Sequence, residues 1–170
     1  MRLPNIHLPI ETEHLRLRRP TRDDADSRFE LQSDPAYVAY VGQPINRQQS
    51  DAQLDEELSD STDYLCVIAC VHGDSSMIGE CVIQMMTDGE PEIVISILPK
   101  YRRSGYGLEL GSAIIRACFG DPDIKRIMAR VDEANSASIE LVQKLAMTRN
   151  GLMIDLFTNE QVRRYVIERP

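Results

Sequence analysis

The chain has 170 residues, of which 42% are apolar, and its formal net charge at pH 7 is −8. This length and apolar content predict one domain, residues 1–170, with a single substantial core. The acidic charge argues against nucleic-acid binding, which needs clustered basic side chains, and suits a cationic partner, although acidic surfaces also keep proteins soluble. No segment approaches the roughly 18 continuous apolar residues of a membrane span, and the N-terminus lacks an apolar signal stretch, so we expect a cytoplasmic protein without a membrane partner.

Alternation of apolar and polar residues predicts a half-buried strand over residues 14–19, which Pro20 ends. A helix should follow, because acidic residues favour the first turn of a helix. Its expected first-turn and buried residues are Asp23, Asp24, Phe29 and Leu31. Residues 46–59 offer an asparagine cap but few apolar side chains, chiefly Ala52, Leu54 and Leu58, which predicts a surface helix.

The middle of the chain predicts an antiparallel meander of three strands, because apolar runs alternate there with turn residues. The expected strands cover residues 64–71, 77–86 and 92–98. An amphipathic helix over residues 108–119, a strand over 126–131, a helix over 136–145 and a hairpin of 152–156 with 162–167 should follow. The fold class is therefore α+β, with a mixed, mostly antiparallel sheet and about four flanking helices.

The most informative segment is YRRSGYG at residues 101–107, where an expected strand meets an expected helix. Gly105 and Gly107 allow the backbone to approach an anion closely, and the first amides of a helix have no intrahelical partners. Arg102 and Arg103 add positive charge at the same place. The segment therefore predicts a pyrophosphate-binding loop, although a pair of glycines at such a turn can also serve backbone geometry alone.

The flanking residues distinguish between nucleotide-binding motifs. The chain has no phosphate loop ending in Gly-Lys-Ser/Thr, and the third glycine of the dinucleotide fingerprint is missing. The pattern Arg-x-x-Gly-x-Gly, present at residues 102–107, resembles the acyl-CoA-binding motif of the GNAT N-acetyltransferase superfamily. The resemblance extends over most of the chain and is greatest to the Rim-type branch, the ribosomal-protein alanine/serine N-acetyltransferases. The end of the last matching helix departs from the family pattern, because KLAM at 144–147 replaces the usual Lys-Leu-Gly-Phe.

The resemblance implies a GNAT fold in which strands 92–98 and 126–131 splay apart and leave one strand edge for the pantetheine arm of acetyl-CoA or CoA. The backbone of Ile97 and Leu98 would pair with pantetheine, unless both residues belong to an ordinary core strand. Asn135 would hydrogen-bond the same arm. The residues expected around the pyrophosphate are Arg102, Arg103, Ser104, Gly105, Tyr106, Gly107 and Leu108.

The implied reaction is direct attack of a neutral primary amine on the thioester, without a covalent enzyme intermediate. Glu92 stands where histone-type relatives place their general base, and we expect it to deprotonate the amine directly or through a water. A solvent-facing strand-end carboxylate is the alternative interpretation of Glu92. Glu80 and Asp155 are lesser candidates for the base.

The leaving thiolate also requires a proton, which many relatives supply from a tyrosine at the position of Val142. Valine cannot donate a proton, so the resemblance points to Ser138 in the Asn-x-x-Ser sequence 135–138 as the general acid. Helix capping is the alternative role, because asparagine and serine are preferred caps.

The acceptor cannot be identified from the sequence, because residues 37–59 and 151–160, which should form its pocket, are the least diagnostic segments. A protein N-terminus, a polyamine, an aminoglycoside-like compound and an amino-acid derivative all stay open, as does a homodimer. The competing hypothesis is a noncatalytic acyl-CoA-binding module that senses or regulates. Turnover with an amine would distinguish an enzyme from such a module.

The cysteines and histidines predict no metal site, because they form no motif with ligand spacing. Cys66 and Cys70 should share one strand face, while Cys81 and Cys118 fall in other buried elements, so reduced core thiols are expected. His7, His14 and His72 are scattered along the chain.

Overall fold

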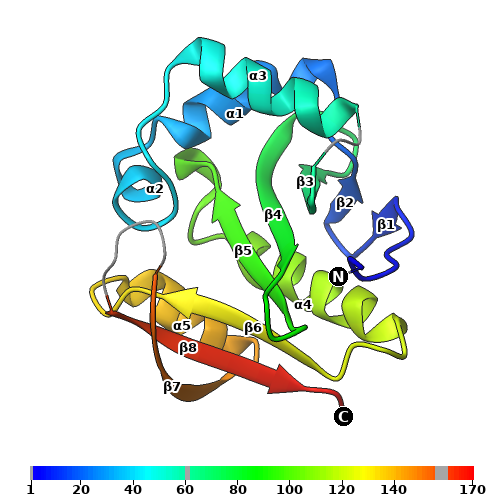
Figure 1. The fold of residues 1–170 in the computed structure, drawn as a ribbon. Helices are drawn as coiled ribbons and strands as arrows, with labels where there is room; N and C mark the ends of the chain where they lie inside the picture. The colour runs from blue at the N-terminus through cyan, green and yellow to red at the C-terminus, as the bar shows by residue number, and fades with distance from the viewer. Residues whose placement is uncertain (1, 60–61, 156–160) are drawn as a thin grey trace.

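A computed structural model describes residues 2–59, 62–155 and 161–170, and its eight strands form one sheet with the order β1-β2-β3-β4-β5-β6-β8-β7 (Figure 1). All neighbouring strands are antiparallel except β5 and β6. The strands are β1 Ile10–Glu11, β2 Leu15–Arg18, β3 Tyr64–Val71, β4 Met77–Met85, β5 Pro91–Ile97, β6 Arg126–Val131, β7 Thr148–Ile154 and β8 Gln161–Glu168. This arrangement confirms the predicted mixed, mostly antiparallel sheet.

Five α-helices lie in the described part of the chain, against the four or so expected. They are α1 Ala25–Gln32, α2 Pro35–Tyr40, α3 Arg47–Leu58, α4 Tyr106–Gly120 and α5 Ser136–Lys144, with 3-10 turns at Arg22–Asp24 and Pro99–Tyr101. None of the described helices is long and apolar enough to cross a membrane. Helices α1 and α3 lie side by side over one end of the sheet, and α4 and α5 lie behind it (Figure 1).

The sheet buries apolar side chains on both faces, which explains the continuous apolar run of β3. Alternate residues of β3 enter two separate cores: Leu65 and Val67 pack toward the α4 side, whereas Cys66 and Cys70 pack with Leu31 of α1. The shared face of Cys66 and Cys70 confirms the sequence prediction. All four cysteines are free and buried.

Helix α4 is buried along the side that faces the sheet, where Leu110 and Ile114 are fully enclosed. The helix begins at Tyr106, two residues before the predicted start, because Gly105 adopts φ +84° and ends the preceding loop. On its outer side, Glu109 accepts hydrogen bonds from the hydroxyl of Thr12 and the backbone amide of His14. The helix therefore fixes the N-terminal segment as well as the sheet.

The surface helix predicted over residues 46–59 is present as α3, and its buried side is more polar than the apolar residues suggested. Asn46 caps α3 through the amide of Gln49 as expected, and Leu54 is buried. Leu58, however, is 37% exposed, and the buried positions of α3 include Ser50 and Glu57 instead. Polar side chains therefore occupy much of the interface between α3 and the sheet.

Two further elements differ from the sequence expectation. Helix α2 was not predicted, although Pro35 at its first position and Asp34 at its cap are standard start signals. In the C-terminal hairpin, β7 begins at Thr148 rather than at residue 152, and β8 lies between β6 and β7. The predicted strand end at Leu156 falls outside the described residues.

Candidate active site

The central strands β5 and β6 diverge. Glu92 with Met128 is the only register pair between these two strands. By contrast, the whole of β5 pairs with β4, from Pro91 opposite Met85 to Ile97 opposite Gly79. The edge of β5 beyond Glu92 therefore faces a gap in the hydrogen-bond ladder. This confirms the splay expected from the sequence.

Strand pairing decides which backbone groups reach the open edge. The amide of Leu98 donates to the carbonyl of Ile78 on β4, and its carbonyl accepts from Tyr101, so both polar groups of Leu98 are engaged within the chain. Because successive residues of a strand point their backbone groups to opposite sides, Ile95 and Ile97 present theirs to the open edge. The open edge therefore presents the backbone groups of Ile95 and Ile97, of which the Ile97 carbonyl already accepts from Nε of Arg102 at 2.9 Å.

The loop after β5 presents a row of free amides. The backbone N–H groups of residues 103–108 donate to no other group of the described chain, and the first α4 amide that pairs with the loop is that of Glu109, bonded to Gly105. Arg103 has φ +64° and Gly105 has φ +84°. A non-glycine residue in this region costs about 1–3 kcal/mol and is typical of functional loops. Consecutive amides in such conformations form a concave anion site at a helix N-terminus.

The two arginines of the loop have different roles in the structure. Arg102 is held within the protein, because its Nε donates to the carbonyl oxygen of Ile97 at 2.9 Å and its Nη2 to Asp34 at 2.7 Å. Arg103 is exposed and forms no hydrogen bond or ion pair with the described residues. The ion pair with Lys144 and, more weakly, the charge of Arg103 lower the pKa of Glu140, which places Arg103 near α5.

Helix α5 reaches the same place from the other side. A Cβ atom added to Gly107 would lie 3.7 Å from side-chain atoms of both Ile97 and Leu141, so the loop, the end of β5 and α5 meet there. Ser138 lies one helical turn before Leu141 and shares its face. The structure thus brings the predicted loop residues and Ser138 to the same end of the open edge.

Asn135 caps helix α5, as the alternative interpretation of this residue expected. Its Oδ1 accepts a hydrogen bond from the backbone amide of Ser138 at 3.1 Å. The backbone amide of Asn135 donates to the carbonyl of Asp132, whereas its side-chain Nδ2 and the hydroxyl of Ser138 form no hydrogen bond with the described residues. Both groups can therefore still donate to a ligand. Val142 is 6% exposed, which leaves the usual tyrosine position filled by a core aliphatic side chain.

Glu92 lies at the opposite end of the open edge and is not the solvent-facing carboxylate of the alternative interpretation, because it is 1% exposed. Arg130 binds it through two nitrogens, at 2.5 and 2.8 Å, and Gln84 donates to it at 2.6 Å. The guanidinium of Arg130 also binds Asp155 at 3.0 Å. Three of the roughly four acceptor positions of the Glu92 carboxylate are therefore used within the protein.

The sequence profile described as Acetyltransferase (GNAT) domain matches residues 14–148. The chain belongs to this family. Among curated proteins, an uncharacterized N-acetyltransferase p20 of Bacillus licheniformis is 26% identical over 152 residues, which cover 86% of this chain and 85% of the relative. The protein is therefore a GNAT N-acetyltransferase, an enzyme that takes its acetyl group from acetyl-CoA.

Solved structures share the GNAT fold over nearly the whole chain. A GNAT-family acetyltransferase from Bacillus anthracis has a TM-score of 0.82 at 20% identity, covering 95% of this chain and 98% of its own. The aminoglycoside acetyltransferase AAC(6')-Ib in complex with coenzyme A has a TM-score of 0.78 at 18% identity, with 91% and 95% covered. A putative ribosomal-protein-serine acetyltransferase from Vibrio cholerae has a TM-score of 0.76 at 18% identity, with 99% and 100% covered.

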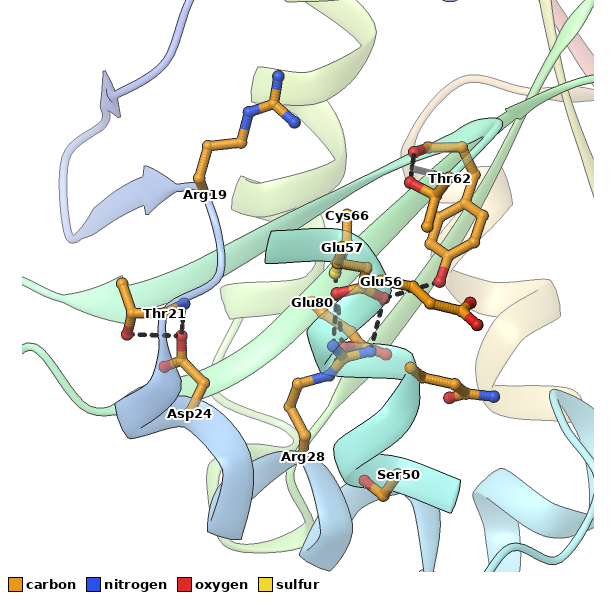
Figure 2. Close-up of polar contacts among 12 residues, drawn as sticks. Arg19, Thr21, Asp24, Arg28, Ser50, Glu56, Glu57, Thr62, Cys66 and Glu80 are labelled. Carbon is orange, nitrogen blue, oxygen red and sulfur yellow. Dashed lines mark hydrogen bonds and ion pairs between the residues drawn. The ribbon is translucent and has the colours of Figure 1, made fainter. Parts of the chain in front are cut away.

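A buried ion cluster, formed by Arg28 of α1, Glu57 of α3 and Glu80 of β4, lies on the other face of the GNAT sheet (Figure 2). Arg28 binds both carboxylate oxygens of Glu57, and its Nε lies 3.4 Å from Glu80. The hydroxyl of Tyr64 donates to Glu57 at 2.9 Å, and Cys66 lies 3.7 Å from Glu80. Burial raises the pKa of Glu80, although Arg28 opposes this effect. Two carboxylates thus share one guanidinium, which favours the retention of a proton.

A groove with a volume of about 880 Å³ runs along α4 from Gly105 toward Asp121. Its other wall is the N-terminal segment, including Ile10 and His14. It shares Gly105 and Leu108 with the predicted loop, whereas neither Ser138 nor Glu92 contributes to it. The groove is therefore connected to the free amides rather than to the open edge of β5.

Proposed function

We propose that this GNAT domain binds acetyl-CoA along the open edge of β5 and transfers the acetyl group directly to a primary amine. The observation that carries the proposal is the continuity of two backbone surfaces, the edge at Ile95 and Ile97, where the Ile97 carbonyl already accepts from Arg102, and the free amides of residues 103–108. Pantetheine contains amides that can complete a strand edge, and pyrophosphate is an anion that suits a row of N–H donors. One extended ligand would satisfy both.

In this proposal the loop binds the pyrophosphate through its amides, and exposed Arg103 supplies a positive charge beside them. Arg102 would contribute positive charge and its remaining N–H donors, because its Nε and one Nη2 hydrogen already bind Ile97 and Asp34. Ile97 keeps its expected place at the pantetheine arm. Ile95 replaces Leu98 there, since the polar groups of Leu98 are bonded within the chain.

The proton transfers are assigned to residues at the two ends of the open edge. Ser138 has a free hydroxyl and would protonate the leaving thiolate, while Asn135 would donate its free amide to the pantetheine arm. Glu92 would accept the proton of the amine at its one remaining acceptor position, or through a water bound there. Its contact with Arg130 orients the carboxylate for this step.

We place the chain in the Rim-type branch, with a protein N-terminus or a small-molecule amine as acceptor. The Asn-x-x-Ser helix and the likeness to the Vibrio cholerae protein support a peptide N-terminus. The likeness to the aminoglycoside acetyltransferase supports a small molecule. An α-amino group, with a pKa of about 7.7–8.0, requires less help from a base than a lysine near 10.4.

The proposal is tested with a panel of α-amines, peptides, polyamines and aminoglycosides incubated with acetyl-CoA. Release of free thiol, followed by mass spectrometry of the products, should show one class gaining an acetyl group. Gly105→Val should abolish both turnover and the thermal shift caused by CoA, because Gly105 requires a positive φ. CoA binding without turnover on any amine would favour the noncatalytic sensor, and absence of CoA binding would refute the site.

A further inference from the structure

Arg102 connects the proposed acyl-CoA loop to a helix on the other face of the sheet. The guanidinium leaves the loop, crosses the end of β5 with a hydrogen bond to Ile97, and forms an ion pair with Asp34 at 2.7 Å. Residues 34 and 102 are 68 positions apart in the sequence, so this contact joins distant parts of the chain. The Asp34 side chain is 11% exposed and that of Arg102 is 34% exposed, so water screens the pair only in part.

Asp34 also determines where α2 begins. The carboxylate oxygen Oδ2 that binds Arg102 accepts the backbone amides of Ala36 and Tyr37, each at 3.1 Å, and the Asp34 carbonyl accepts the amide of Val38. Burial alone would raise the pKa of Asp34, but the hydrogen bonds from Arg102 and these amides outweigh it and lower the pKa. A single oxygen atom is therefore shared between the loop arginine and the helix cap.

Helix α2 also packs against the residue at the end of β5. Tyr37 packs against the core that contains Leu31 of α1 and Leu98, the residue directly after β5. The charges of Glu80, Arg28 and Glu57 all act on the Tyr37 hydroxyl, whose pKa is raised mainly by burial. A displacement of α2 would therefore disturb the end of β5.

We infer that Asp34 is a positioning residue that transmits acyl-CoA binding to helix α2, the first part of the proposed acceptor segment 37–59. The inference rests on the proposed acetyl-CoA site. The guanidinium of Arg102 has five N–H donors, and two of them are used by Ile97 and Asp34. The remaining three can bind an anion held by the neighbouring loop amides without release of Asp34. A bound pyrophosphate would thus fix Arg102, and Arg102 would fix the cap of α2.

Hydrogen–deuterium exchange with and without CoA tests this coupling without a known acceptor. In the parent protein, CoA should slow amide exchange both in the loop 103–108 and in residues 36–42, the latter by about fivefold or more, the lower end of usual coupling between sites. In Asp34→Asn the loop should still respond and α2 should not. Asparagine remains a good helix cap, so the variant removes the charge while α2 stays folded.

A matched control is Asp74→Asn, which removes the same charge from an aspartate that also accepts a backbone amide, that of Ser76, in a distant hairpin. It should leave the α2 response intact, whereas Arg102→Ala should abolish it. The inference would be overturned if CoA left amide exchange in α2 of the parent unchanged, or if CoA still slowed exchange in α2 of Asp34→Asn. Neither result would contradict the acetyl-CoA site. A loop that does not respond to CoA in the parent would refute the proposed function itself.

Discussion

Gly79 on β4 is the residue whose substitution should damage the open edge most directly. It pairs with Ile97, and a Cβ atom at this position would lie 2.5 Å from the backbone oxygen of Ser96 and 2.6 Å from Cδ1 of Ile97. A side chain can rotate away from such a contact, but the carbonyl of Ser96 cannot. Gly79→Ala must therefore separate β4 from β5 at Ile97, near the end of the open edge that leads into the loop.

The expected cost follows from this geometry. Overpacking of a core typically costs about 1–3 kcal/mol, and for a protein of this size 1 kcal/mol lowers Tm by roughly 2–4 °C, so Gly79→Ala should lower Tm by about 2–12 °C. The affinity for CoA should fall about tenfold or more, equivalent to about 1.4 kcal/mol, because the backbone groups of Ile97 move.

Differential scanning fluorimetry and isothermal titration with CoA measure both quantities. Gly111→Ala in α4 is the matched control: its Cβ would lie 2.8 Å from Cδ1 atoms of Ile95 and Leu145, the flexible ends of side chains. The helix propensity of alanine, about 1 kcal/mol better than glycine, offsets part of that contact. If Gly79→Ala had the same Tm and the same affinity for CoA as the parent, the close approach of Gly79 to Ser96 and Ile97 would not be needed for the binding edge.

Three further predictions concern ionisable and polar side chains. Because burial raises the pKa of Glu80, the folded state holds a proton at pH values where the unfolded state has released it. The contribution of this group to the free energy of unfolding is therefore complete below about pH 4.3, the usual pKa of glutamate, and is lost as the pH rises through the raised pKa. Glu80→Gln should reduce the fall of stability with rising pH, so that its Tm at about pH 8 exceeds that of the parent. If Tm of the variant and of the parent changed in parallel from about pH 4 to pH 8, this prediction would be contradicted. Ser138→Ala should lower turnover by about 10²-fold or more at unchanged acetyl-CoA affinity and Tm, whereas a loss seen only in Tm would indicate a structural role. Glu92→Gln should slow the reaction most at low pH, and a pH–rate profile parallel to that of the parent would exclude Glu92 as the base.

Local patterns sufficed to predict the elements that position the site. The run from residue 92 to residue 107 contains a strand, a proline stop and two glycines, and each signal acts within a few residues. The splay could be expected only through the family resemblance. Leu98 does not contribute to the open edge, because its backbone amide bonds to Ile78 on β4. The sequence shows that backbone groups alternate along the strand, but not which residues face β4 and which face the open edge.

The features that escaped prediction depend on partners far away in the sequence. Burial of Arg28 requires Glu57 and Glu80, and the helical pattern of α1 and α3 contains no signal for a charged interior. Helix α2 has six residues, too few for an apolar period to be recognised. Asp34 and Pro35 do form a start signal that a search for caps could have found, whereas the contact of Asp34 with Arg102 required the fold.

The pairing of β6 has a consequence for the order in which a nascent chain can fold. β6 has six register pairs with β8 and one with β5, and β8 begins 30 residues after β6 ends, at Gln161 after Val131. While the ribosome is still adding those residues, strands β2 to β5 and helix α4 can already assemble. β6 meanwhile exposes an unpaired edge, a hazard for aggregation that its packing against α4 and α5 must limit. The loop that precedes α4 can therefore form before the second half of the sheet is complete.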